Sequence, residues 1–199
     1  MSIRIAVVIG TVRPGNFTSR AARLVVDELK MDGEVEADLI DPAGLNLSFP
    51  GLPSEGSRGA DLKERIERAT GVVLATPEYH GSFSSVMKLV IENLGFPSVL
   101  ATKPVALLGV ASGQIGAIKS LEQLRSVCSH VGAIVLPGPV SIANVQALFD
   151  EKGRCLDEVA EKRIRGLAHA LLDYIKGSVC PRLALEEMVR THAGRAPAA

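Results

Sequence analysis

Short apolar runs alternate with longer amphipathic segments along this chain. The runs have the length and content of strands, and the segments between and after them repeat apolar positions at helical spacing. The predicted strands are Ile3 to Ile9, Val35 to Ile40, Gly71 to Ala75, Pro104 to Val110 and Ala133 to Leu136. The predicted helices are Thr18 to Lys30, Gly59 to Ala69, Ser84 to Leu94, Ile115 to Val131 and Leu156 to Ile175. This βαβ alternation predicts an α/β fold.

Several of the predicted strands are apolar without interruption, as in Ala6 to Ile9, Val72 to Ala75 and Val105 to Leu108. Continuous apolar character indicates strands that are covered on both faces. We therefore expect a parallel sheet between two layers of helices, with right-handed crossovers. A chain of 199 residues, 47% of them hydrophobic, is long enough to bury this core as one domain.

Three stretches depart from the alternation. Asp41 to Ser57 is rich in Pro and Gly, and so long a connection is typical of a functional or interfacial loop. Pro137 to Pro139 interrupts the last strand, so we expect a bulge or a break there, with Val140 to Ala143 beyond it. The tail, residues 177 to 199, is expected to be partly disordered: Leu183 to Val189 fits a short helix, and Gly194 to Ala199 resembles a disordered end.

The loop after the first strand has the residues of an anion site. Gly10 to Arg20 joins a strand to a helix N-terminus, where unpaired backbone N–H groups and the helix dipole favour negative charge. Arg13, Asn16, Thr18 and Ser19 add side-chain donors. The loop has neither a Walker A lysine nor the GxGxxG spacing, which favours the phosphate of a mononucleotide. On its own it is equally consistent with Thr18 or Ser19 as a helix N-cap and Arg13 as a solvated charge.

Two further loops have the residues of a slot for a planar ring. Thr76 to Ser82 follows the third predicted strand and Ala111 to Ala117 follows the fourth, and both are small, polar and Gly-containing. Loops of this kind let a backbone approach a flat ligand closely at the edge of a parallel sheet. Tyr79 alone could equally be an aromatic residue at the core edge, and Glu78 a helix-start charge. His80 has no acidic partner or metal-ligand spacing in the sequence, so we assign it no catalytic role.

Charge and cysteine usage exclude several classes of protein. Lys plus Arg number 22 and Asp plus Glu number 22, so the chain lacks the basic balance of a nucleic-acid-binding protein. No apolar run is long enough to span a bilayer, and no signal-peptide pattern opens the chain, so we expect no membrane partner and a cytoplasmic location. The three cysteines, Cys128, Cys155 and Cys180, are widely spaced and suggest neither a disulfide framework nor a metal site.

The three loops together closely resemble those of the NADPH-dependent FMN reductase family, whose relatives include quinone, azo-dye and chromate reductases. The resemblance covers roughly residues 3 to 176 and is most specific at Thr76 to Phe83. It implies a flavodoxin-like three-layer sandwich with a five-stranded parallel sheet of order 2-1-3-4-5, helices on both faces, and FMN at the switch point. The FMN-binding domain would then be residues 1 to 176.

The resemblance also implies the cofactor contacts. Arg13, Asn16, Phe17 and Thr18 would hold the FMN phosphate; Pro77 to His80 would line the isoalloxazine largely through backbone groups; and Ser112 and Gly113 would close the far side. The full set of predicted contacts is Thr11, Arg13, Asn16, Phe17, Thr18, Pro77, Glu78, Tyr79, His80, Gly81, Ser82, Ser112 and Gly113. Relatives often carry Ser at Asn16 and Asn at His80, and many place a Trp after the helix that follows, which Ile91 to Leu94 lacks.

These features predict an NAD(P)H-dependent oxidoreductase in which FMN carries the chemistry and the protein supplies no catalytic side chain. Hydride would pass from NADPH or NADH to the flavin, and then electrons to a free flavin, quinone, azo dye or metal oxyanion, in a ping-pong cycle. Two alternatives remain open. One is an FMN-binding electron carrier without steady-state reductase activity, and the other is a reductase that supplies free reduced FMN to a partner monooxygenase. The sequence does not distinguish NADPH from NADH.

An apolar patch is expected near the flavin edge. Leu45, Leu47, Phe49, Phe83, Val86 and Phe96 come from the long connection and from the helix around Ser84 to Gly95. A patch of this size is larger than a monomer ordinarily exposes. We therefore expect a homodimer or homotetramer with the flavin near the interface.

Overall fold

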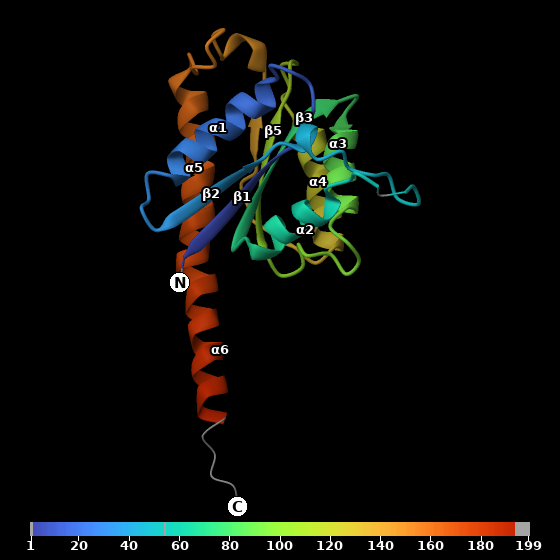
Figure 1. Ribbon diagram of the computed structural model, residues 1–199. Coiled ribbons are helices and arrows are strands. Elements are labelled where there is room, and N and C mark those ends of the chain that lie inside the picture. Colours follow the sequence, from blue (N-terminus) through green and yellow to red (C-terminus); the bar gives the residue numbers. More distant parts are fainter. Residues whose placement is uncertain (1, 54, 194–199) are drawn as a thin grey trace, which may run out of the picture.

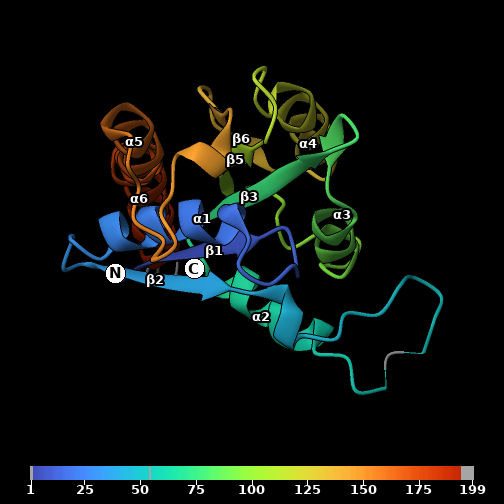
Figure 2. The same ribbon diagram turned by 90° about the horizontal axis from the view of Figure 1, so that it is seen from above.

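The protein has three layers, with one sheet between two sets of helices (Figures 1 and 2). The computed structural model describes residues 2–53 and 55–193. Helices α1 (Phe17–Leu29) and α5 (Glu158–Tyr174) cover one face of the sheet. Helices α2 (Gly59–Arg68), α3 (Ser85–Glu92) and α4 (Ile118–His130) cover the other. The predicted α/β sandwich is confirmed.

The sheet has the predicted strand order. Its main path is β2 (Val35–Ile40), β1 (Ile3–Ile9), β3 (Gly71–Tyr79), β5 (Pro104–Val110) and β6 (Ile134–Val135), all parallel. When only these strands are counted, the order is the expected 2-1-3-4-5. The structure adds two short strands: β4 (Ser82–Phe83), antiparallel to β3, and β7 (Val140–Ile142), parallel to β5.

The break predicted at Pro137 to Pro139 divides the last strand in two. β6 pairs with the start of β5 through Pro104 and Val105, and β7 pairs with its end through Leu108 to Val110. Pro137 and Pro139 have no backbone N–H and cannot donate to the ladder, so the strand does not continue along β5 through them. The chain therefore leaves the sheet and rejoins it beside the carboxyl end of β5.

Alternate residues of the central strands fill two separate cores. Ile5, Val7 and Ile9 of β1 face α1 and α5, whereas Ala6 and Val8 face the other helix layer. Both faces are buried because successive side chains of a strand point to opposite sides. This arrangement explains why the sequence is apolar without alternation.

The C-terminal segment is helical for longer than the sequence suggested. After α5 the helix continues through a π-helical turn, η3 (Ile175–Val179), into α6 (Cys180–Ala193), which extends away from the rest of the fold (Figure 1). The short helix expected at Leu183 to Val189 is thus the middle of a longer one. The expectation for Gly194 to Ala199 lies outside the described residues. Within the described part, no helix has both the length and the apolar content needed to cross a bilayer.

A glycine in β5 lets α4 lie close against the sheet. A Cβ added at Gly109 would come 2.6 Å from the Cβ of Ala117 and 2.9 Å from the Cγ of Leu121. Any side chain there would push the start of α4 outward. The start of this helix, and the loop that leads into it from β5, are therefore fixed by the absence of a side chain at Gly109.

We predict that Gly109→Ala lowers the free energy of unfolding by about 1–3 kcal/mol, because the added methyl overpacks a closed contact. The matched control is Gly166→Ala within α5, where no atom lies within 4 Å of the added Cβ. It should raise the free energy of unfolding by about 0.5–1 kcal/mol, because alanine loses less entropy than glycine in a helix. Urea unfolding of both variants measures the effects, and equal signs would contradict the packing argument.

Candidate functional site

Three loops meet at one edge of the sheet because the strands before them are parallel neighbours. β1, β3 and β5 lie side by side, so their carboxyl ends reach the same edge. β1 is also where the order reverses, with β2 on one side and β3 on the other. Open α/β sheets bind ligands in the crevice at this kind of switch point.

A buried serine joins the first two loops. Ser84, at the N-cap of α3, donates its hydroxyl to the carbonyl of Gly10 and accepts a hydrogen bond from Met87 N at 3.0 Å. Its backbone N–H donates to Thr76 Oγ1 at 3.2 Å, and Gly10 N donates to Ala75 O at 2.7 Å. A Cβ at Gly10 would lie 2.8 Å from that Ala75 oxygen. The ends of β1 and β3 are thus held together without room for a side chain.

The first loop leads into α1 with its N–H groups directed at the site. Asn16 is the N-cap: its Oδ1 accepts from Ser19 N at 2.6 Å, and its Nδ2 donates to Arg13 O at 2.7 Å. The N-cap is therefore neither Thr18 nor Ser19, the two residues considered from sequence. The cap satisfies one of the N–H groups that open the helix and leaves those of Phe17 and Thr18 for an anion. No acidic residue lies in the first turn.

The predicted loop at Thr76 to Ser82 is a β-hairpin. β3 continues beyond Ala75 to Tyr79, and Glu78 pairs with Phe83 and Tyr79 with Ser82. The turn residues His80 and Gly81 have φ values of 51° and 75°. Positive φ at both central residues is the mark of a two-residue turn that matches the twist of the strands. His80 is thus an exposed turn residue.

The third loop is held by the segment after β7. Ala111 N donates to Ile142 O at 2.9 Å, and Val145 N donates back to Ala111 O at 3.1 Å. Gln146 Nε2 donates to Ser112 O at 3.1 Å, and Asn144 N donates to Gly113 O at 3.2 Å. These bonds bring Val145, which lies more than 30 residues after Ala111 in the chain, to the edge of the site.

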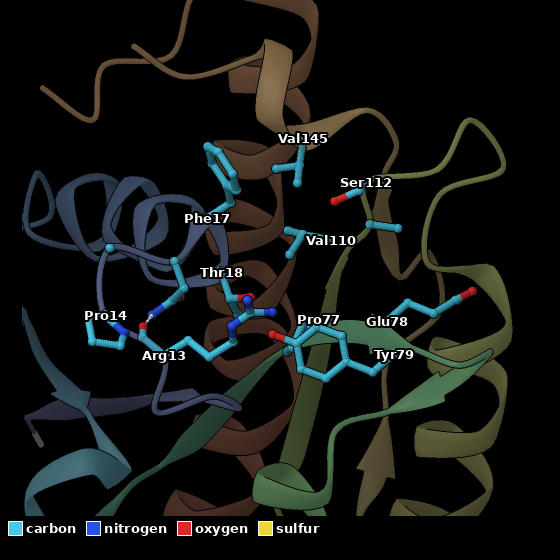
Figure 3. A pocket seen from close by; sticks show the side chains of 13 residues that line it. Arg13, Pro14, Phe17, Thr18, Pro77, Glu78, Tyr79, Val110, Ser112 and Val145 are labelled. Carbon is cyan, nitrogen blue, oxygen red and sulfur yellow. Dashed lines mark hydrogen bonds between the residues drawn. The ribbon is translucent and has the colours of Figure 1, made fainter. Parts of the chain in front are cut away.

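The loops enclose a cavity of about 320 Å³ (Figure 3). Arg13 and Tyr79 point toward each other across it, and the guanidinium carbon lies 5.9 Å from the ring centroid. Phe17, Val110 and Val145 form an apolar part on another side. The full lining is Arg13, Pro14, Gly15, Asn16, Phe17, Thr18, Pro77, Glu78, Tyr79, Val110, Ala111, Ser112 and Val145.

The cavity combines a cationic region with an apolar one. Arg13 makes no ion pair within the described residues and lies beside the N-terminus of α1. Glu78 is the one carboxylate among the lining residues that the structure describes, and its Oε2 accepts from Ser120 N at 3.1 Å. Its side chain points away from Tyr79 (Figure 3). The cavity therefore suits an anion attached to a flat apolar group.

Most of the predicted contact residues line this cavity. They are Arg13, Asn16, Phe17, Thr18, Pro77, Glu78, Tyr79 and Ser112. Thr11 is buried beneath the first loop, where its Oγ1 accepts from Arg13 N at 3.3 Å. His80, Gly81 and Ser82 form the hairpin turn and its return strand, and neither they nor Gly113 are part of the lining.

The sequence reasoning missed Pro14, Gly15, Val110, Ala111 and Val145 as lining residues. Pro14, Gly15 and Ala111 lie within the loops identified from sequence, and Val110 is the residue directly before the third loop, so including whole loops and one flanking position would have found these four. Val145 carries no such signal, because it reaches the cavity through tertiary hydrogen bonds to Ala111.

Comparison with known proteins identifies the family. Residues 3–147 match the model of NADPH-dependent FMN reductase. The chain belongs to this family. It is 28% identical over 170 residues to a 2-hydroxy-1,4-benzoquinone reductase of a Burkholderia species, covering 83% of this chain and 92% of the relative. It is also 28% identical over 179 residues to an NAD(P)H-dependent FMN reductase of Pseudomonas aeruginosa, covering 87% and 96%.

A solved structure agrees with this assignment. FerB, a flavoenzyme NAD(P)H:(acceptor) oxidoreductase from Paracoccus denitrificans, superposes with a TM-score of 0.71 at 25% identity, covering 88% of this chain and 98% of FerB. The fold is therefore that of the flavodoxin-like NAD(P)H–FMN oxidoreductases. The protein is an oxidoreductase that uses FMN, with NAD(P)H as co-substrate.

The residues of the cavity fit FMN. An uncapped pair of helix N–H groups and an arginine without an acidic partner suit a phosphate, and Pro77, Val110 and Val145 suit a ring system. Among the described residues no cluster of His, Cys, Asp or Glu is arranged to hold a metal ion. Burial raises the pKa of the Cys128 thiol to about 12, so that residue supplies no thiolate at neutral pH.

Proposed function

We propose that the protein oxidises NAD(P)H and reduces a free flavin, a quinone, an azo dye or a metal oxyanion in alternating half-reactions at this one cavity. Bound FMN supplies the redox chemistry, by taking a hydride from NAD(P)H and returning electrons to the acceptor. The observation that carries the proposal is the cavity itself, which joins a cationic helix N-terminus to an apolar wall at the switch point. Nicotinamide and acceptor would use this same cavity in turn.

The chain's own residues have binding and orienting roles in this proposal. Arg13 and the N–H groups of Phe17 and Thr18 hold the phosphate, and the backbone of Pro77 to Tyr79 flanks the ring, with Ser112 on the far side. The carboxylate of Glu78 accepts a hydrogen bond from Ser120 N of α4 and points away from Tyr79 (Figure 3). Protons would therefore be exchanged with solvent, and backbone N–H groups would stabilise negative charge on the reduced ring.

The site also bears on the two alternatives, a pure electron carrier and a reductase that supplies free reduced FMN to a monooxygenase. A pure electron carrier usually surrounds its flavin with acidic and aromatic residues. Here the formal net charge is zero, and the described lining holds one carboxylate, Glu78, and two aromatic residues, Phe17 and Tyr79. A site without an acidic rim favours access by a nicotinamide. A reductase that releases reduced FMN to a monooxygenase has the same cavity and differs in how tightly FMN is held.

The proposed function predicts how the flavin absorbance bands change when the purified protein is mixed with FMN under anaerobic conditions. NADPH or NADH should bleach the flavin bands, and an added quinone should restore them and support continuous turnover. Bleaching without turnover would indicate an electron carrier. Loss of all colour on dialysis would indicate that FMN is a diffusible substrate. Failure of the protein to bind FMN would overturn the proposal.

We predict that Arg13→Ala weakens FMN binding about 10- to 100-fold and riboflavin binding much less, because it removes a charge-assisted contact to the phosphate alone. The matched control is Arg23→Ala in α1, which removes the same charge from an exposed residue without an ion pair in the described structure. It should change neither affinity. Flavin fluorescence titrations measure both ligands, and equal losses for FMN and riboflavin would place Arg13 at the ring.

We also propose that the protein forms a homodimer through the groove between α3 and α4. The groove has a volume of about 600 Å³ and is lined in part by Ile91, Phe96 and Val127. Phe96 is 95% exposed, and Phe49 is 61% exposed. A protruding aromatic ring and a groove on one face are self-complementary, as a two-fold interface requires. Leu45, expected in the patch, is instead buried in the core.

The dimer is tested by sedimentation at micromolar concentration. Phe96→Glu should shift the protein to monomer, because it puts a charge into an apolar contact. Met31→Glu, at an exposed position beyond α1 on the other side of the sheet, should leave the mass unchanged. A monomeric wild-type protein would contradict the proposal.

A further inference from the structure

The hairpin beside the cavity is too short to be stable on its own. β3 extends beyond the main sheet to Tyr79, and only Glu78–Phe83 and Tyr79–Ser82 pair across the turn. Two-stranded ribbons are marginal in water even when they are longer. His80 also holds a φ of 51°, which costs energy in a residue other than glycine. Something outside the hairpin must therefore keep it in place.

Helix α4 supplies that support through side-chain hydrogen bonds. Gln123 binds the second turn residue and the first residue of β4: its Nε2 donates to Gly81 O at 3.0 Å, and its Oε1 accepts from Ser82 Oγ at 2.7 Å. Ser120 N, one turn earlier on the helix, donates to Glu78 Oε2 at 3.1 Å. The outer half of the hairpin is thus attached to α4 at both of its strands.

The attachment matters because the hairpin carries one wall of the cavity. Pro77, Glu78 and Tyr79 line the cavity, whereas Gln123 does not. Glu78 extends from this wall away from the ring of Tyr79 (Figure 3). A displacement of the turn would move Tyr79 and the backbone groups next to it relative to Arg13 on the opposite loop. An exposed residue outside the cavity is therefore coupled to its shape.

We propose that Gln123 is a positioning residue for flavin binding, which holds the hairpin 78–83 in its binding-competent position by bridging Ser82 and Gly81. This inference rests on the proposed FMN site. A primary amide is suited to this role because one group accepts from the hydroxyl while the other donates to the carbonyl. Without the bridge the competent hairpin is populated for a smaller fraction of the time, and the apparent affinity for FMN falls by that fraction.

The test compares FMN titrations, thermal unfolding without FMN, and amide hydrogen exchange of the hairpin. Gln123→Ala should raise the Kd for FMN about three- to tenfold, which corresponds to the loss of one or two neutral hydrogen bonds. It should speed exchange at residues 78–83 and leave the unfolding temperature of the FMN-free protein unchanged. Ser82→Ala should have a smaller effect, Ser82→Thr should bind FMN like the wild type, and Ser82→Ala should add nothing to Gln123→Ala.

Glu122→Ala is the matched control, because Glu122 is exposed, adjacent on α4, and its side chain makes no hydrogen bond or ion pair among the described residues. It should match the wild type in all three measurements. The inference is overturned if Gln123→Ala binds FMN like the wild type, or if its loss of affinity comes with an equal loss of stability in the FMN-free protein. Failure of the wild type itself to bind FMN would instead refute the proposed function.

Discussion

The site depends on the hydrogen bond from the buried hydroxyl of Ser84 to the carbonyl of Gly10. This bond connects the end of β1 to the N-cap of α3, and the N–H of Ser84 connects the same point to Thr76 at the end of β3. Each polar group is buried, so leaving one without a partner would cost about 1–3 kcal/mol. The loop after β1 and the hairpin at the end of β3 are therefore held in fixed positions relative to each other by bonds within the chain.

Away from this junction, the loops are held by elements that contribute few or no residues to the cavity lining. Gly109 allows α4 to approach the sheet, and α4 then binds the outer hairpin through Gln123. The segment after β7 does the same for the third loop through Gln146 and Ser112. A ligand that is recognised through backbone groups needs such support, because backbone position cannot be corrected by a change of rotamer.

The sequence predicted those features that depend on local pattern. The alternation of strand-like runs with amphipathic segments identified the five parallel strands, and the loops after β1, β3 and β5 identified most of the cavity. The hairpin was read as a loop, since Pro77 and Gly81 suggest irregular structure and its partner strand has only two residues. Val145 and Gln123 could not be found from sequence. Val145 reaches the cavity through a hydrogen bond from its N–H to Ala111 O, and Gln123 acts through a hydrogen bond to Gly81 O, 42 positions away; no local spacing pattern indicates either contact. Asn16 was recognised as a donor, but its role as N-cap depends on where the helix begins.

Under the proposed function, the same arrangement would allow one cavity to serve chemically different acceptors. Its one described carboxylate, Glu78, is used to hold α4, and its turn histidine lies outside the lining. If FMN carries the chemistry as proposed, the requirements on an acceptor would be shape and reduction potential rather than a matching acid or base on the protein. Selectivity would then depend on the groups that line the cavity, where Arg13 and Tyr79 face each other. A flat or anionic acceptor would meet a cation and an aromatic face there, and both groups stand on segments whose backbones are held by other parts of the fold.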